Sequence, residues 1–287
     1  MTENGLSLGL RARVALEANG FHFTHSIGQN FILDEDVIGD IVSLAGVCEG
    51  DNILEIGPGS GMMTAMMADR GAKVLAIELD RALENVLRDV IGDRNVKIVF
   101  QDAMKADITL LAGEYFGTDA PYKIVANLPY YITADFLMRA VTLQRKPESI
   151  TVMVQKEAAE RVMSSPGDKN WSALSATLKY FSEAEFLMEA PRTLFTPPPH
   201  VDSALIRLNM RKQRPLEGEN ETRFLRFIQA AFRMRRKTLA NNLSSDMAIP
   251  REKAVSAIEG AGFDARIRGE ALEIEELVGI FENLVQE

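Results

Sequence analysis

Four consecutive residues, Asn127-Leu128-Pro129-Tyr130, combine two hydrogen-bond acceptors with a stiff turn and an aromatic ring. The Asn127 side-chain oxygen and the Leu128 backbone carbonyl can accept both hydrogens of one exocyclic amine. This grip would draw the amine nitrogen toward a tetrahedral shape and aim its lone pair at an electrophile. Pro129 stiffens the turn, and the Tyr130 ring can stack on a base, a contact worth about 1–3 kcal/mol. Because positioning supplies most of the rate, no strong general base is needed.

A glycine-rich turn precedes these residues in the chain. Residues 53–61 read Ile-Leu-Glu-Ile-Gly-Pro-Gly-Ser-Gly, a buried strand that runs into a tight turn. Gly57, Gly59 and Gly61 carry no Cβ, so the backbone can approach a ligand closely. The spacing is G-x-G-x-G, which differs from the G-x-G-x-x-G of dinucleotide folds. A plain strand-to-helix connection is the alternative interpretation of this turn.

Two carboxylates follow the next two predicted strands. Glu78 ends the strand after the turn and can accept hydrogen bonds from both hydroxyls of a ribose, and Asp102 follows the third strand, where an adenine amine would lie. Two acidic strand ends after such a turn suit an adenosyl ligand without a pyrophosphate. We therefore favour S-adenosyl-L-methionine over NAD as the ligand. The 127–130 pattern is also that of enzymes that methylate exocyclic amines, whose delocalised lone pair makes them poor nucleophiles.

Strand-helix alternation must position these residues. Short apolar runs at 52–56, 73–77, 96–100, 123–126 and 149–154 predict buried strands, and amphipathic stretches such as 61–70, 81–91 and 133–142 predict helices between them. This alternation indicates a parallel sheet covered on both faces, hence an α/β, Rossmann-like fold. A late strand is expected at 204–208, and the prolines at 197–199 predict a stiff loop.

Beyond a polar linker at 212–220 the sequence shows helical patterns only, including 222–231 and 270–285. We expect a Rossmann-like methyltransferase domain at 1–209 and a small all-helical domain at 210–287.

Composition narrows the function classes. Cys48 is the only cysteine among 287 residues, and His22, His25 and His200 are too scattered for a metal cluster or a histidine-based triad, so we expect no metal. No signal peptide and no apolar run of about 20 residues is found, so we expect a cytoplasmic protein without membrane segments. The net charge of −9 is unevenly spread. Residues 207–237 carry ten lysines or arginines against three glutamates, a net of +7 that leaves −16 for the remainder.

In this order and spacing the motifs resemble the KsgA/RsmA family of ribosomal small-subunit RNA adenine dimethyltransferases along nearly the whole chain. The N-terminal Gly-Gln-Asn-Phe-Ile-Leu-Asp at 28–34 is similar to a family motif, as are the segments at 55–61, 78–80, 101–103 and 127–131. The same holds for 155–157, 166–167, 195–203 and 235–239. Ile32 stands for the usual Leu, Gln101 for a frequent Gly, and Trp171-Ser172 for a frequent Tyr-Gly. We expect only the last departure to alter a substrate-facing loop.

The resemblance implies roles for individual residues. The implied cofactor-binding residues are Gln29, Asn30, the backbone at Ile32, Gly57, Gly59, Glu78, Asp102 and Asn127. The implied catalytic set is Asn127, Leu128, Pro129 and Tyr130 with Phe195, and Tyr130 and Phe195 would sandwich the target adenine. Phe31 is expected to be buried or to form a lid contact. Arg233, Arg235, Arg236 and Lys237 would contact RNA phosphates, which set affinity but do not select the base.

The implied reaction is dimethylation of N6 on two adjacent adenines in the 3′-terminal hairpin loop of 16S rRNA during ribosome biogenesis. The substrate would be small-subunit rRNA within an immature 30S particle, and the enzyme a monomer. Three alternatives stay open. The macrolide-resistance methyltransferases act on large-subunit rRNA, but they tend to be basic and to carry Ile at the position of Leu128. A protein that checks subunit assembly and a DNA amino-methyltransferase are the other two.

Overall fold

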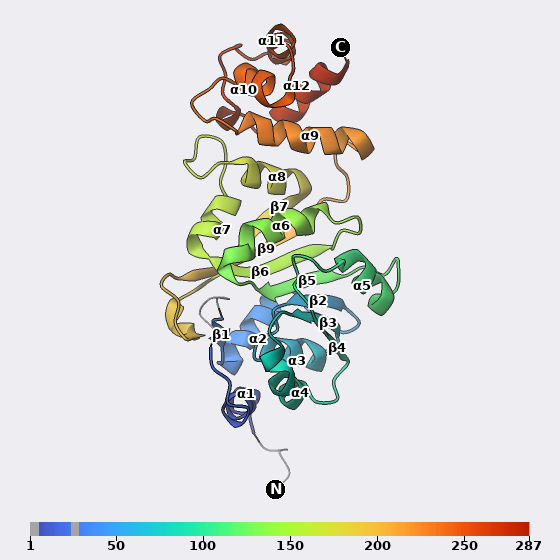
Figure 1. Cartoon of the computed structure of the whole chain (residues 1–287), viewed down its shortest axis with the longest axis vertical. Helices are drawn as coiled ribbons and strands as arrows, with labels where there is room; N and C mark the ends of the chain where they lie inside the picture. The colour runs from blue at the N-terminus through green and yellow to red at the C-terminus, as the bar shows by residue number, and fades with distance from the viewer. Residues whose placement is uncertain (1–5, 24–28, 287) are drawn as a thin grey trace. The chain divides into compact units, whose positions relative to one another are not determined.

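The computed structural model describes residues 6–23 and 29–286, so Gly28 of the N-terminal motif lies outside the described residues. Its centre is a seven-stranded sheet in the order β4-β3-β2-β5-β6-β9-β7 (Figure 1). These strands are β2 (Asn52–Ile56), β3 (Lys73–Glu78), β4 (Val96–Phe100), β5 (Lys123–Asn127), β6 (Ser149–Gln155), β7 (Ser182–Ala190) and β9 (Ser203–Met210). A separate antiparallel pair is formed by β1 (Phe31–Ile32) and β8 (Phe195–Thr196).

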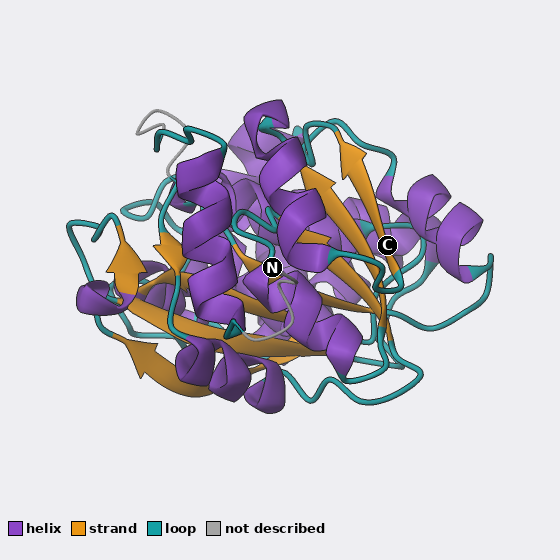
Figure 2. Ribbon diagram, turned by 90° about the horizontal axis from the view of Figure 1, so that it is seen from below, coloured by secondary structure: helices purple, strands orange, loops and turns teal. Residues whose placement is uncertain are grey.

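Helices lie on both faces of the sheet (Figure 2). In the first part of the chain a strand separates each helix from the next, except that α8 directly follows α7: α1 (Leu8–Ala18), α2 (Glu35–Leu44), α3 (Met62–Asp69), α4 (Glu84–Ile91), α5 (Ile108–Phe116), α6 (Thr133–Thr142), α7 (Lys156–Val162) and α8 (Ala173–Phe181). The last four are consecutive: α9 (Gly218–Ala231), α10 (Leu239–Met247), α11 (Arg251–Gly260) and α12 (Ile274–Gln286). The α/β fold predicted from the sequence is confirmed.

Five of the seven strands, β4-β3-β2-β5-β6, are parallel. The apolar runs of β2, β3, β5 and β6 are buried on both faces, as in β2, where Ile53 and Leu54 are fully buried, whereas β4 at the edge is only partly buried. The carboxyl ends of these strands therefore meet at one edge of the sheet. The sheet is nevertheless mixed, because β9 runs antiparallel to β6. The parallel arrangement expected from the sequence therefore holds for these five strands and does not extend to β9.

The strand β7 has no counterpart among the predicted strands. Its sequence carries three glutamates in nine residues, and only its two terminal residues are buried. It lies at the end of the strand order and needs no continuous apolar run. A polar edge strand of this kind gives a weak signal in the sequence.

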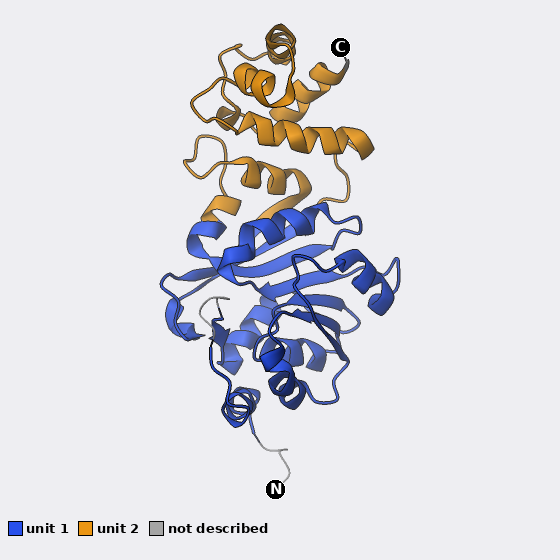
Figure 3. Cartoon of the chain, in the orientation of Figure 1, with its two compact units in different colours: residues 1–159, 185–210 blue, residues 160–184, 211–287 orange. Residues whose placement is uncertain are grey.

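The chain divides into two compact units, residues 1–159 with 185–210 and residues 160–184 with 211–287 (Figure 3). The predicted division into 1–209 and 210–287 therefore differs at one segment, because residues 160–184 group with the C-terminal helices. Within that unit α8 packs against α9 and α12, and the Tyr180 ring lies 5.1 Å from the Phe224 ring. The core is aromatic, with Phe224, Phe227 and Phe281 in mutual contact.

Among the described residues, no helix is both long and apolar enough to cross a membrane.

Candidate active site

The glycine-rich turn lies at the carboxyl end of β2, where the chain turns into α3. Gly57, Gly59 and Gly61 have φ of 69°, 56° and 78°, in the left-handed region that side chains with a Cβ disfavour. The Gly57 N–H donates to the Ile77 carbonyl oxygen at 2.9 Å, which ties the turn to β3. The turn thus needs glycine for its backbone conformation.

At Gly59 the requirement is also steric. A Cβ there would lie 2.8 Å from Cε1 of Phe31, closer than side chains pack. The Phe31 ring is itself held, 5.9 Å from the Phe21 ring and 5.2 Å from the Phe23 ring. The burial predicted for Phe31 is confirmed, since the side chain is 7 % exposed.

Glu78, at the end of β3, accepts hydrogen bonds from two backbone segments. Its carboxylate accepts from the Gly59 N–H at 3.2 Å and from the Asp80 N–H at 2.8 Å. Burial raises the pKa of Glu78, and these backbone donors act in the opposite direction. Gln29 Nε2 donates to Asp80 Oδ2 at 2.9 Å, so the N-terminal segment is fastened to the same strand end.

Asp102 follows β4 on the same edge of the sheet. Its Oδ1 accepts from the Met104 N–H at 2.8 Å, and its Oδ2 lies 3.4 Å from the Lys105 ammonium. The turn that carries it is braced by Arg139 of α6, whose guanidinium donates to the carbonyls of Ala103 and Ala106. Asp102 therefore sits in a fixed turn with its carboxylate part-buried.

Asn127 is the last residue of β5, and its amide is oriented by a long-range contact. Its Nδ2 donates to the backbone carbonyl of Asn30 at 3.0 Å. Because the amide nitrogen is engaged, Oδ1 is left as the acceptor of the group. The Leu128 N–H donates to the Met153 carbonyl at 3.3 Å, which ties the turn to β6.

Tyr130 begins the short 3-10 helix η3 (Tyr130–Ile132). Its hydroxyl lies 2.7 Å from Oγ of Ser203 at the start of β9, which fixes the rotation of the ring. Burial raises the pKa of Tyr130, and the bond with Ser203 partly offsets this. The phenol is thus held protonated, as a ring-positioning group.

These residues line one open cavity of about 770 Å³, its mouth included. The predicted residues on its wall are Gln29, Asn30, Gly57, Gly59, Glu78, Asp102, Asn127, Leu128, Pro129 and Tyr130. The cavity also contains residues to which no role was assigned, notably Leu79 and Tyr131, whose side chains are 48 % and 58 % exposed. Both lie inside motifs noted in the sequence, and both line the cavity as exposed large apolar groups.

Ile32 and Phe195 lie elsewhere. They pair with each other across β1 and β8 and are both 3 % exposed. Ile32 lines a second cavity of about 430 Å³ that shares Phe31, Gly57, Gly59 and Asn127 with the first. Phe195 lines neither and packs in the hydrophobic core, so its ring has no exposed face for a base in this structure. Its stacking role stays a prediction.

Glu55, in the middle of the glycine-rich motif, faces the second cavity and was not predicted to have a role. It is fully buried, and its Oε2 accepts from the Thr64 hydroxyl at 2.5 Å. Burial raises the pKa of Glu55 to about 8, with the Thr64 hydrogen bond opposing and the Glu78 carboxylate adding to the shift. The other oxygen, Oε1, has no partner among the described residues.

The four cations predicted to bind RNA follow α9 and are all exposed. Arg235 is engaged with Glu270 at 2.7 Å, whereas Arg233 approaches Asp246 only to 3.8 Å. Trp171, named above as a departure from the family pattern, is fully buried against Phe232. It is a packing residue, and the expected change to a substrate-facing surface does not arise from its ring.

The sequence model of ribosomal RNA adenine dimethylases matches residues 20–284 of the chain. The chain belongs to this family. It is 40 % identical over 280 residues to the ribosomal RNA small subunit methyltransferase A of Ligilactobacillus salivarius, covering 96 % of this chain and 95 % of that protein. The protein of the same name from Geobacillus thermodenitrificans is 39 % identical over 274 residues, 94 % of each chain. This rRNA adenine dimethylase is therefore a methyltransferase.

Solved structures agree in fold. A dimethyladenosine transferase from Plasmodium falciparum superposes with a TM-score of 0.72 at 22 % identity, over 86 % of this chain and 94 % of that one. The 23S rRNA methyltransferase ErmE superposes with a TM-score of 0.68 at 28 % identity, over 90 % and 100 %. The Rossmann-like fold with a helical C-terminal region is confirmed.

Membership in a methyltransferase family implies use of S-adenosylmethionine, and the cavity fits that molecule. A Cβ at Gly57 would meet no atom closer than 4.0 Å, so the backbone there leaves room that a side chain would fill, and carboxylates stand at two strand ends of the same cavity. Among the described residues no group of three or more histidine, cysteine or acidic side chains could hold a metal ion.

Proposed function

We propose that this rRNA adenine dimethylase uses S-adenosylmethionine to dimethylate N6 of two adjacent adenines in the 3′-terminal hairpin loop of 16S rRNA. The observation that carries the proposal is the oriented Asn127 amide at the wall of a cavity that also contains Glu78 and Asp102. The names of the relatives, which specify the small ribosomal subunit, support the choice of substrate.

On the cofactor side, Glu78 would accept from the ribose hydroxyls and Asp102 from the adenine amine of S-adenosylmethionine. Gly57 and Gly59 provide the close backbone approach, and Gln29, Asn30 and the Ile32 backbone contribute the N-terminal wall. Leu79 adds an exposed apolar contact beside Glu78. When bound, S-adenosylmethionine supplies an electrophilic methyl group.

On the substrate side, Asn127 Oδ1 and the Leu128 carbonyl accept the two N6 hydrogens of an extruded adenine. The nitrogen lone pair then points into the cavity, and rate enhancement comes from positioning. Pro129 keeps the two acceptors at a fixed spacing, and Tyr130 stacks on the base, with its ring fixed by Ser203. After one methylation N6 keeps one hydrogen and a lone pair, so the same site can act twice.

Phe195 is assigned the second face of the adenine sandwich. Phe195 belongs to β8 and is buried where β8 pairs with β1, so this role requires the β8 segment to move when RNA binds. Base extrusion itself costs little, because bases in a hairpin loop are poorly stacked.

The helical domain would bind RNA through the exposed cations at 233–237. We further propose that the substrate is an immature 30S particle, that the enzyme acts as a monomer and that it works in the cytoplasm. The acidity of the rest of the chain, −16 outside residues 207–237, would limit non-specific RNA binding.

The test compares isolated small subunits that lack the modification with large subunits, each incubated with the enzyme and labelled S-adenosylmethionine. Label in small-subunit rRNA alone is the expected result. Because ErmE, a 23S rRNA methyltransferase, shares this fold, the large subunit is the informative control. Label in large-subunit rRNA alone would overturn the substrate assignment and leave the cofactor site intact.

A further inference from the structure

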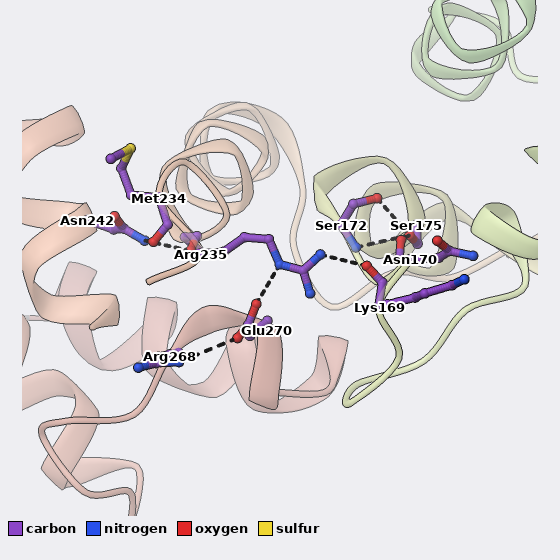
Figure 4. Close-up of polar contacts among 10 residues, drawn as sticks. Lys169, Asn170, Ser172, Ser175, Met234, Arg235, Asn242, Arg268 and Glu270 are labelled. Carbon is purple, nitrogen blue, oxygen red and sulfur yellow. Dashed lines mark hydrogen bonds and ion pairs between the residues drawn. The ribbon is translucent and has the colours of Figure 1, made fainter. Parts of the chain in front are cut away.

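Three segments of the helical unit meet at the Arg235 side chain (Figure 4). Its Nε donates to Glu270 Oε2 at 2.7 Å, and its Nη1 donates to the backbone carbonyl of Lys169 at 2.6 Å. The Gly167 N–H donates in turn to the Glu270 carbonyl at 3.4 Å. The loop at 167–169 is therefore tied both to Arg235 and to the residue that Arg235 binds.

These contacts distinguish Arg235 from its neighbours. Two of the three guanidinium nitrogens, Nε and Nη1, donate internal hydrogen bonds, and the Glu270 carboxylate neutralises the charge. Within residues 6–23 and 29–286, Arg236 and Lys237 have no ion pair or side-chain hydrogen bond, and both are exposed. A bidentate phosphate contact through Nε or Nη1 would compete with one of these internal hydrogen bonds of Arg235, while Arg236 and Lys237 would break none.

The segment that Arg235 holds presents a further cation. Lys169 is exposed, and its side chain extends away from the Arg235 guanidinium (Figure 4). In the described part of the chain its ammonium has no partner. The following residues fix the other end of the loop, since Trp171 is buried against Phe232 and Ser172 forms a capping box with Ser175 at the start of α8. Lys169 is thus an unpaired charge on a loop held from both sides.

We propose that Arg235 is a positioning residue and that Lys169, on the loop it holds, is an RNA phosphate contact that acts together with Arg236 and Lys237. This inference rests on the proposed function, because it assigns different roles to individual residues of the proposed RNA-binding surface. It adds Lys169 to that surface and removes Arg235 from direct contact with RNA.

Salt dependence of binding separates the two roles. Each phosphate contact contributes about 0.7–0.9 to the slope of log K against log salt concentration. We expect Lys169→Ala and Arg236→Ala each to lower affinity roughly fivefold and to reduce the slope by one such step. The pair Lys169→Ala with Arg236→Ala should lose two steps. The double variant Arg235→Ala with Lys169→Ala should reduce the slope by only one step, because both substitutions remove the same phosphate contact, that of Lys169.

A charge-conserving pair of variants sharpens the test. Lysine keeps the charge that a phosphate needs but lacks the fork that reaches Glu270 and the Lys169 carbonyl together. We therefore expect Arg235→Lys to match Arg235→Ala in slope, and Arg236→Lys to match the wild type. A purely structural role for Arg235 would lower the melting temperature without changing the slope.

The inference is overturned if Lys169→Ala leaves the slope unchanged, or if Arg235→Lys restores it. Binding is measured with small subunits lacking the modification, and melting temperatures confirm that each variant is folded. If Arg235→Ala does not fold, the slope of Lys169→Ala is compared with that of Arg236→Ala. The two variants should reduce the slope by the same amount. Absence of wild-type binding to small subunits would refute the proposed function itself, which is a different outcome.

Discussion

Replacing Gly59 by alanine tests whether the glycine-rich turn is shaped for close approach. The residue has φ of 56°, and a left-handed conformation costs an L-residue about 1–2 kcal/mol. The new Cβ would lie 2.8 Å from Phe31 Cε1, whereas ordinary contacts begin near 3.4 Å. Either the ring or the turn must then move by about half an ångström, and such overpacking costs about 1–3 kcal/mol.

The variant Gly50→Ala is a matched control. Gly50 also has a positive φ, 82°, but a Cβ there would meet no atom within 4 Å. It precedes β2, at the end of the strand opposite to Gly59. We therefore expect the backbone cost alone, about 1–2 kcal/mol, and no effect on the cavity.

The assay is calorimetric titration with S-adenosylmethionine alongside denaturant unfolding. We expect Gly59→Ala to lose about 2–5 kcal/mol of stability, the sum of the two costs. Its cofactor affinity should fall at least about tenfold, a change of about 1.4 kcal/mol. Gly50→Ala should keep wild-type affinity. A Gly59→Ala protein that binds within twofold of wild type would refute the assignment of this turn to the cofactor.

Three further predictions concern single side chains. Asn127→Ala should lower the methylation rate at saturating cofactor by about 10²–10³-fold. The control variant Asn52→Ala loses a similar hydrogen bond to the Pro121 carbonyl and should keep the wild-type rate. Equal rates for the two variants would contradict the acceptor role of Asn127. Tyr130→Phe keeps the ring and should retain kcat/KM within about threefold, while Tyr130→Ala should lose roughly 5- to 150-fold, the value of a stacking contact of about 1–3 kcal/mol; a phenylalanine variant as slow as alanine would argue against stacking. Burial raises the pKa of Glu55 to about 8, so the folded protein binds this proton more tightly than the unfolded chain, and the free energy of unfolding should fall as pH rises from 4.5 to 8. Without cofactor, Glu55→Gln should reduce this pH dependence by up to about 1.4 kcal/mol per pH unit. The same pH dependence in wild type and variant would show that Glu55 is ionised.

The parallel part of the sheet and the cavity could be predicted from the sequence, because their signals are local. Short apolar runs that alternate with helical patterns, such as 74–77, indicate buried strands, and a polar residue just after such a run lies at the carboxyl edge. Glu78, Asp102 and Asn127 were placed together by this reasoning, and the structure brings all three to one cavity. β7 gave no such signal, because an edge strand needs no apolar run.

Contacts between distant segments could not be predicted. The amide of Asn127 is oriented by Asn30, 97 positions earlier, and no spacing rule links the two. In the same way, a run of four cations gives each residue the same expected role. Only the fold shows that Arg235 has internal partners at positions 169 and 270. Phe195 likewise has an aromatic side chain suited to stacking, yet its pairing with Ile32 buries it.

The most direct test of the account identifies the product itself. Small-subunit rRNA from the reaction with labelled S-adenosylmethionine is digested to nucleosides and to loop fragments, and both are analysed by mass spectrometry. We expect N6,N6-dimethyladenosine at two adjacent positions of the 3′-terminal hairpin loop, and no detectable product with Asn127→Ala on the same timescale. Methyl groups on another atom or another nucleotide, or an Asn127→Ala enzyme as fast as the wild type, would contradict this mechanism.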